Sequence, residues 1–260
     1  MPRCLLALPA NRDNLRAMKI RIVQLGVLEE MSANQGRMMA ALDTAQADEW
    51  LVFPEGVLSG YFPDRADYLA RLDAPAIERA IENIQRLVQA RKCNCLFGTA
   101  LLREGHWRNS VLLLTSDGAR HVHHKVELSA LDRKVFAPGT QVTRYTVGDL
   151  TLGIQACREL LFPQTWSALK AAGAQIIFHL NNAIQPHDAQ WEHLLIARAI
   201  EQSIFVCSVN NGQPPQALAS YLIAPSGRVM LKTELQRDQT LSAEIDLGEI
   251  IADLSLRTDY

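Results

Sequence analysis

Short strand-like segments run through almost the whole chain, joined at some points by helices and at others by tight turns. Residues 19–25 nearly alternate polar and apolar side chains, 32–46 have helical periodicity, and 50–53 form a brief apolar run. Residues 95–125 contain two acidic-glycine turns and are typical of a meander of three antiparallel strands. Because strand–helix–strand units are mixed with hairpins, we expect a single mixed α/β domain.

The later part of the chain continues this pattern. A helix with one apolar face is expected after Asp73, which can cap it, with Pro75 in its first turn. Two more helices are expected at 163–172 and 187–202, whereas the charged stretch 126–139 predicts a loop with at most a short helix. The remaining strands are expected at 96–102, 143–147, 150–156, 175–179, 204–209, 219–224, 228–231 and 241–245.

Composition limits the classes of protein that fit. The chain has 260 residues, of which 48% are hydrophobic, so it can bury a sizeable core. A net charge of −2 favours neither a nucleic-acid nor a membrane-surface partner, and no apolar run approaches the roughly 18 residues of a membrane span. Five cysteines, an odd number, favour a reducing compartment, so we expect a cytoplasmic protein. We interpret residues 1–17 as an N-terminal extension and 18–260 as the domain.

A lone cysteine stands at the end of a predicted strand. Residues 150–163 read LTLGIQACRELLFP, so an apolar strand stops at Cys157 and a charged pair follows it. A sharp turn there can display a thiol beside backbone N–H groups, as a nucleophile requires. The alternative is a small buried hydrophobe, which is how we interpret Cys93, Cys95 and Cys207.

Two distant residues favour the reactive interpretation. Glu55 follows an apolar strand and a proline, where partial burial would raise its pKa and prepare it to accept a proton. Lys125 follows a strand and precedes the irregular loop, so its ammonium could stabilise a developing negative charge. Taken singly, a solvated glutamate and a surface lysine are the simpler alternatives.

Three histidines near Lys125 raise the question of a metal site. A strand would place His121 and His123 on one face and His124 on the other, and no cysteine or carboxylate pattern completes a tetrahedral set. We therefore expect no metal.

Three motifs in the order glutamate, lysine, cysteine resemble the nitrilase (carbon–nitrogen hydrolase) superfamily. They read FPEGVLSGY, HHKVEL and QACRELLFPQ, and the likeness extends over nearly the whole chain from about Lys19. The resemblance implies a four-layer αββα sandwich and a triad in which Glu55 is the general base, Lys125 the oxyanion-side lysine and Cys157 the nucleophile. It also implies that no cofactor is needed and that the protein forms a homo-oligomer, a dimer or larger.

The implied chemistry is hydrolysis of a small linear amide or N-carbamoyl compound through a Cys157 thioester, with the Arg158 N–H as a second oxyanion donor. A nitrile substrate is less expected, because nitrile-cleaving members often carry tryptophan where Arg158 stands. Two alternatives stay open at this point. One is a member of the fold that binds a metabolite or partner without turnover, and the other is acyl transfer to an amine.

The chain departs from the family pattern in two places. Many members carry another glutamate in the loop after the lysine, and here Asp132 or Glu127 would take that role. The arginine that holds a substrate carboxylate in some members is replaced by Leu161, which disfavours a dicarboxylate-like substrate. Arg158 could substitute for it, or could instead form an ion pair with a nearby acid such as Glu159.

The remaining candidates concern the substrate pocket. Asn181 and Asn182 follow a strand where the family lines its pocket, so their amides are expected to donate to a substrate carbonyl; a self-satisfied polar loop is the alternative. Tyr61, at the end of the first motif, is taken as another substrate-binding residue. His179 is interpreted as a satisfied core histidine.

Overall fold

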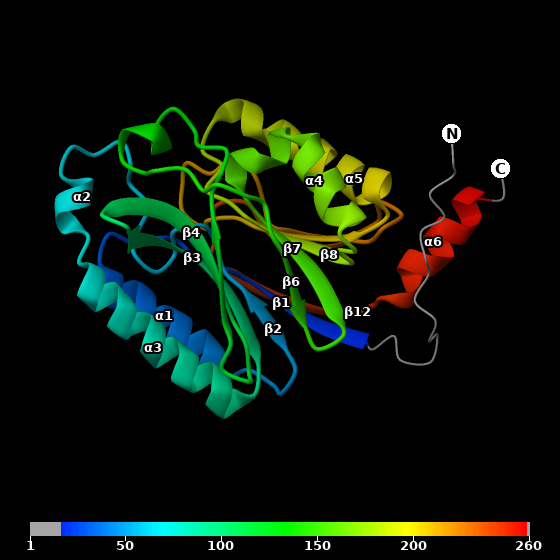
Figure 1. Cartoon of the computed structure of the whole chain (residues 1–260), viewed down its shortest axis with the longest axis horizontal. Helices are drawn as coiled ribbons and strands as arrows, with labels where there is room; N and C mark the ends of the chain where they lie inside the picture. The colour runs from blue at the N-terminus through cyan, green and yellow to red at the C-terminus, as the bar shows by residue number, and fades with distance from the viewer. Residues whose placement is uncertain (1–16, 259–260) are drawn as a thin grey trace.

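The computed structural model describes residues 17–258, which form two facing six-stranded sheets (Figure 1). The first sheet has the strand order β12-β1-β2-β3-β4-β5, with parallel pairing of β1, β2 and β3 and antiparallel pairing towards both edges. Its strands are β1 (Ala17–Gln24), β2 (Trp50–Val52), β3 (Asn94–Arg103), β4 (His106–Leu114), β5 (Arg120–His124) and β12 (Gln239–Asp246).

The second sheet repeats this plan. Its order is β11-β10-β9-β8-β7-β6, again with three central parallel strands and antiparallel edges. The strands are β6 (Arg144–Val147), β7 (Leu150–Ala156), β8 (Ile176–Leu180), β9 (Phe205–Val209), β10 (Tyr221–Ile223) and β11 (Val229–Lys232). The parallel strands end at the same side of each sheet, where polar side chains can be brought together.

Helices cover the outer face of each sheet. In Figure 1, α1 (Met31–Asp43) and α3 (Ala74–Arg91) lie on the first sheet, and α4 (Pro163–Ala171) and α5 (Trp191–Gln202) on the second. The expected four-layer αββα sandwich is therefore confirmed. The shorter helices are α2 (Tyr68–Arg71) and the 3-10 turns η2 (Asp132–Lys134), η3 (Cys157–Leu161) and η4 (Pro186–Gln190), and α6 (Gly248–Thr258) projects from one end.

The two sheets share an apolar core. Alternate residues of β1, such as Ile20 and Ile22, face the second sheet and are fully buried, as the period of two in a strand requires. Across the interface Trp50 stacks on Phe178 with ring centroids 5.6 Å apart. This rigid double sheet supports the loops that carry the polar residues.

Several predicted boundaries are wrong. Helix α1 begins at Met31 after Glu30 with no side-chain cap, so Ser32 is inside the helix and not its cap. The helix expected at 187–202 is a 3-10 turn up to Gln190 and α-helical from Trp191 onwards. Helices α2 and α6 were not predicted. One turn is too short to have a period, and α6 is held by packing of Ile250 against the inter-sheet core, which no local pattern reveals.

Two further expectations concern the chain as a whole. The proposed extension, apart from Ala17 at the start of β1, lies outside the described residues. None of the helices within residues 17–258 is long and apolar enough to cross a membrane.

Candidate active site

Glu55 is placed by a close approach between its loop and β3. After β2 the chain leaves the sheet, the Gly98 N–H donates to the Pro54 carbonyl at 3.0 Å, and the Leu58 N–H donates to the Gly98 carbonyl at 3.1 Å. A Cβ on Gly98 would lie 2.2 Å from the nitrogen of Gly56 and 2.5 Å from the Cα of Glu55. Glycine is therefore required at position 98 for the loop to sit this close.

A Gly98→Ala variant is accordingly expected to lose about 1–3 kcal/mol of unfolding free energy, because the added methyl group overlaps backbone atoms. Urea unfolding measures this loss. Gly36→Ala is the matched control, since nothing lies within 4 Å of a Cβ there and the site is inside α1; it should be neutral or stabilising. Equal stability of Gly98→Ala and the unaltered protein would contradict the close approach.

A buried lysine just after β5 lies between two carboxylates, one that follows β2 and one in η2. Lys125 Nζ donates to Glu55 Oε1 at 2.9 Å and to Asp132 Oδ2 at 2.8 Å, and all three side chains are fully buried. Asn109 donates to the same Glu55 oxygen at 2.7 Å, and the Tyr61 hydroxyl donates to Asp132 Oδ1 at 2.6 Å. Among the described residues Glu55 Oε2 has no hydrogen-bond partner, so it is an open proton acceptor.

The Glu127 or Asp132 alternative can now be decided by position. Asp132 is the first residue of η2 and forms two hydrogen bonds with Ser129. The Ser129 N–H donates to the Asp132 carboxylate at 3.1 Å, and the Asp132 N–H donates to the Ser129 hydroxyl at 3.0 Å. This turn brings the shorter aspartate to Lys125, whereas Glu127 lies half-buried.

Burial and charge set the protonation of this cluster. Burial raises the pKa of Glu55 above its ordinary value, although the charge of Lys125 opposes the rise. Burial alone would also raise the pKa of Asp132, but the charge and hydrogen bond of Lys125 outweigh it and the pKa is lowered. Burial disfavours the ammonium of Lys125, yet the carboxylates raise its pKa well above the usual range. The cluster therefore holds a charged lysine, an ionised Asp132 and a Glu55 that is readily protonated.

Cys157 is displayed on a strained turn where β7 ends and η3 begins. Its φ of 46° lies in the left-handed region, which non-glycine residues seldom occupy outside functional turns. His179 Nε2 lies 2.9 Å from the carbonyl oxygen of Cys157, and the backbone N–H of Asn182 donates to the sulfur. Burial and then the charge of Glu55 raise the pKa of the Cys157 thiol, so the sulfur needs a base to react at neutral pH.

Glu159 ties the cysteine turn to the lysine turn. Its carboxylate accepts from the Ala156 N–H at 2.6 Å, from the Val126 N–H at 2.7 Å and from His123 Nε2 at 2.9 Å. Burial alone would raise the pKa of Glu159, but these partners, His123 first, lower it. The alternative of an ion pair between Arg158 and Glu159 is therefore wrong: the Glu159 carboxylate is already occupied, and the Arg158 guanidinium lies over the Phe162 ring instead.

A cavity of about 490 Å³ opens over Cys157. Arg158, Asn182 and Tyr61 line it, as expected for substrate-binding candidates, and Leu161 lines it too. Asn181 does not fit that expectation, because it is fully buried and its amide donates to Ser208 Oγ at 2.7 Å. The apolar part of the wall comes from Val27, Phe62, Pro63, Ala130, Leu131, Leu161, Ile184, Trp191, Pro214 and Pro215.

Comparison with known proteins agrees with this geometry. A family model described as carbon-nitrogen hydrolase matches residues 19–253. The chain belongs to the carbon–nitrogen hydrolase family. It is 30% identical over 251 residues to an (R)-stereoselective amidase from a Pseudomonas species, covering 94% of this chain and 89% of that protein.

Solved structures have the same fold. A nitrilase-superfamily protein of Saccharomyces cerevisiae has a TM-score of 0.82 at 19% identity, covering 94% of both chains. An amidase from a Nesterenkonia species has a TM-score of 0.79 at 20% identity, covering 93% of this chain and 96% of that one. Variants of that amidase carry covalent adducts at the active-site cysteine.

The family model over residues 19–253 and the 30% identical amidase together make this protein a carbon–nitrogen hydrolase. Three polar residues of the hydrolase that support its site were missed or assigned no role from the sequence: Asn109, His123 and Glu159. The available signal was weak: Asn109 stands among the polar residues that open β4, and His123 and Glu159 are ionisable residues two positions from Lys125 and Cys157.

The histidines of this carbon–nitrogen hydrolase lie in different settings. His123 faces Glu159, His124 Nδ1 is 2.8 Å from Ser110 Oγ, and His121 packs against the Tyr145 ring. Among residues 17–258 no group of three or more His, Cys, Asp or Glu side chains is arranged to hold a metal ion.

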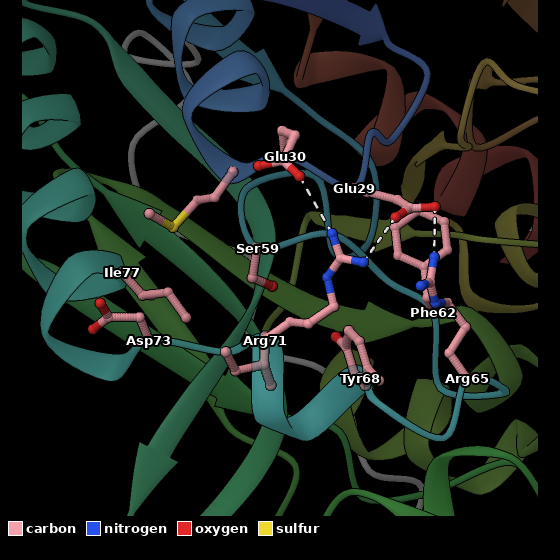
Figure 2. Close-up of a pocket in the computed structure, with 11 residues that line it drawn as sticks. Glu29, Glu30, Ser59, Phe62, Arg65, Tyr68, Arg71, Asp73 and Ile77 are labelled. Carbon is pink, nitrogen blue, oxygen red and sulfur yellow. Dashed lines mark hydrogen bonds and ion pairs between the residues drawn. The ribbon is translucent and has the colours of Figure 1, made fainter.

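A second cavity of the hydrolase, about 120 Å³, lies beside the first, with Phe62 in the wall of both. Figure 2 shows Arg71 between Glu29 and Glu30, and Arg65 against Glu29; the ion-pair distances are 2.6–3.2 Å. These exposed pairs fasten the segment that continues from Tyr61, and each contributes at most about 1 kcal/mol.

Proposed function

We propose that this carbon–nitrogen hydrolase is an amidase that cleaves small uncharged carboxamides through a thioester at Cys157. The observation that carries the proposal is the buried cluster of Lys125 between Glu55 and Asp132, together with a strained cysteine in the wall of a partly apolar cavity. A lysine held by two carboxylates is a fixed positive charge, which suits stabilisation of an oxyanion better than proton transfer.

In the first half-reaction Glu55 takes the thiol proton as the Cys157 sulfur bonds to the amide carbon. Concerted transfer is required because the pKa values of both groups are raised, so a free thiolate is scarce at neutral pH. The carbonyl oxygen becomes an oxyanion held by Lys125 and the Arg158 N–H. Glu55 then returns the proton to the leaving nitrogen, the C–N bond breaks, and ammonia leaves a thioester on Cys157.

In the second half-reaction Glu55 accepts a proton from water, which attacks the thioester carbon through the same oxyanion site. Collapse breaks the C–S bond, returns the proton to sulfur and releases the carboxylic acid. Asp132 stays ionised throughout and, with Tyr61, holds Lys125 in position.

The cavity wall sets the expected substrate class. The apolar part of the wall suits an uncharged acyl group, and Leu161 offers no charge to hold a carboxylate. Arg158 also lines the cavity, but its guanidinium lies over the Phe162 ring. The (R)-stereoselective amidase is a relative over almost the whole chain, so enantiomers of an α-branched amide belong in the test. N-carbamoyl compounds are the second candidate, since the same carbonyl chemistry applies; nitriles remain less expected because Arg158 follows the nucleophile.

The test is a panel of propionamide, butyramide, both enantiomers of an α-branched amide, an N-carbamoyl amino acid, succinamate and butyronitrile, followed by ammonia release. We expect turnover of the uncharged amides and little of succinamate. Glu55→Gln should lower turnover about 10²–10⁴-fold through loss of the base. It should nevertheless leave Cys157 open to alkylation by acrylamide, because Glu55 is a negative charge that raises the thiol pKa.

In the Nesterenkonia amidase, a variant with one glutamate replaced by glutamine carries an acrylamide adduct at its active-site cysteine, which supports that expectation. No ammonia from any panel member, with saturable binding unaffected by Cys157→Ala, would favour the binding-only alternative instead. A shorter aspartate in place of the second family glutamate would have favoured that alternative, but Asp132 does reach Lys125 with its carboxylate. Self-association stays a prediction.

A further inference from the structure

His179 contacts the nucleophile's backbone from the interior of the second sheet. It is fully buried on β8, and its Nε2 lies 2.9 Å from the carbonyl oxygen of Cys157. On the other side of the ring, Nδ1 lies 3.1 Å from Asn181 Nδ2 and 3.2 Å from Ser208 Oγ. The reaction outlined above gives this residue no role.

These contacts determine the protonation of the ring. A carbonyl oxygen can only accept a hydrogen bond, so Nε2 must carry the proton that is donated to Cys157. Nδ1 is then an acceptor, which matches the amide NH₂ of Asn181 beside it. Burial lowers the pKa of His179 to about 4, so the ring stays neutral around pH 7.

The direction of the Cys157 carbonyl determines the direction of the next N–H. In a planar trans peptide the C=O and N–H bonds point to opposite sides. The carbonyl points inward to His179, which sits between the rings of Trp166 and Trp191 at centroid distances of 5.8 and 6.5 Å. The N–H of Arg158, on the opposite side of this peptide, is therefore directed toward the cavity that Cys157 and Arg158 line.

We propose that His179 is a positioning residue: by holding the Cys157 carbonyl it fixes the plane of the following peptide and aims the Arg158 N–H at the oxyanion. This rests on the proposed function. An accepted hydrogen bond also polarises the peptide and strengthens its N–H as a donor. Cys157 therefore has two contacts with the segment around the end of β8: His179 with its carbonyl oxygen, and the Asn182 N–H with its sulfur.

The test compares the unaltered protein with His179→Gln and His179→Asn. A glutamine amide can reach the place of Nε2 and donate to Cys157, whereas an asparagine amide reaches only the place of Nδ1. Three quantities are measured: the rate of Cys157 alkylation by iodoacetamide, the Kd of butyraldehyde from its protection against alkylation, and kcat and KM for the best amide of the panel. The Cys157 sulfur adds to the butyraldehyde carbonyl while Glu55 accepts the thiol proton, so the aldehyde oxygen takes the oxyanion position. Alkylation displaces iodide at a CH₂ group and forms no oxyanion.

We expect similar alkylation rates in all three proteins. In His179→Asn, kcat and the butyraldehyde affinity should fall about 10–100-fold with little change in KM, and His179→Gln should recover most of both. The proposal would be overturned by any of three results. The butyraldehyde affinity of His179→Asn could equal that of the unaltered protein, or His179→Gln could lose as much kcat and affinity as His179→Asn. In the third, butyraldehyde would not protect Cys157 of the unaltered protein from alkylation. If no amide is hydrolysed but aldehyde affinity still falls in His179→Asn, the proposed function fails and the role of His179 stands.

A measurement on the unaltered protein covers the case in which a variant does not fold. The ¹⁵N chemical shifts of the His179 ring at pH 7 should show a neutral ring protonated at Nε2. A ring protonated at Nδ1, or at both nitrogens, would overturn the proposal, because the first could not donate to Cys157 and the second contradicts the acceptor role of Nδ1.

Discussion

Replacing Cys157 with alanine is expected to lower amide turnover by about 10⁴-fold or more, to the background rate, because Cys157 is the only cysteine within residues 17–258 that lines the cavity. The fold should survive. Alanine keeps the Cβ of cysteine, so the left-handed backbone at this position is no more strained, and we expect the unfolding free energy to change by about 1 kcal/mol or less. Ammonia release and urea unfolding measure the two effects.

Cys207→Ala is the matched control. Cys207 is fully buried on β9 in the inter-sheet core, and burial raises the pKa of its thiol. Loss of the Cys207 sulfur should lower the unfolding free energy. It should leave amide turnover unchanged, as well as the mass that the substrate acyl group on Cys157 adds to the protein. If Cys157→Ala retained even a tenth of the turnover, or Cys207→Ala lost it, the assigned nucleophile would be wrong.

Replacing Lys125 with methionine is expected to remove both activity and stability. Turnover should fall at least about 10²–10³-fold through loss of an oxyanion donor. The methionine side chain fills about the same space as lysine. Glu55 and Asp132 are nevertheless left buried without their cation, which should cost about 3–5 kcal/mol of unfolding free energy at pH 7. Urea unfolding at several pH values measures this cost.

The pH dependence of that loss has a definite sign. In the unaltered protein the pKa of Asp132 is lowered, so its ionised form stabilises the fold above pH 3.8, and this is lost as pH falls through the lowered value. Without Lys125 both carboxylates bind protons more readily in the fold, so the variant gains stability as pH falls. The difference in unfolding free energy between the unaltered protein and Lys125→Met should therefore become smaller from pH 7 towards pH 4. Adding Asp132→Asn to Lys125→Met should recover part of the lost stability. Equal stability of Lys125→Met and the unaltered protein at pH 7 would contradict the buried ion cluster.

Local chemistry explains what could be predicted for the fold. Asp73 caps the N-terminus of α3 as expected: its side chain accepts a hydrogen bond from the Ala76 N–H at 2.9 Å. This could be predicted because capping depends on residues only three positions apart. Strand β1 alternates over most of its length, and the central strands β2, β8 and β9 are short runs buried at every position; both patterns depend only on neighbouring residues. Helix α6 escaped prediction because it is stabilised by the distant inter-sheet core.

For the site, the sequence by itself determined the kinds of reactive residue and their order, since Glu55, Lys125 and Cys157 each stand in a short motif at the end of a strand. Only the tertiary structure decided their partners. Asp132 rather than Glu127 reaches Lys125 because of a turn held by Ser129, and Glu159 joins two loops rather than pairing with Arg158. His179 meets the Cys157 carbonyl because β8 lies parallel to β7. The Asp132 contact depends on the path of a local loop. The contacts of Glu159 with Val126 and of His179 with Cys157 join residues 33 and 22 positions apart, so they depend on how separate strands are aligned, and a short-range sequence pattern carries no record of that alignment.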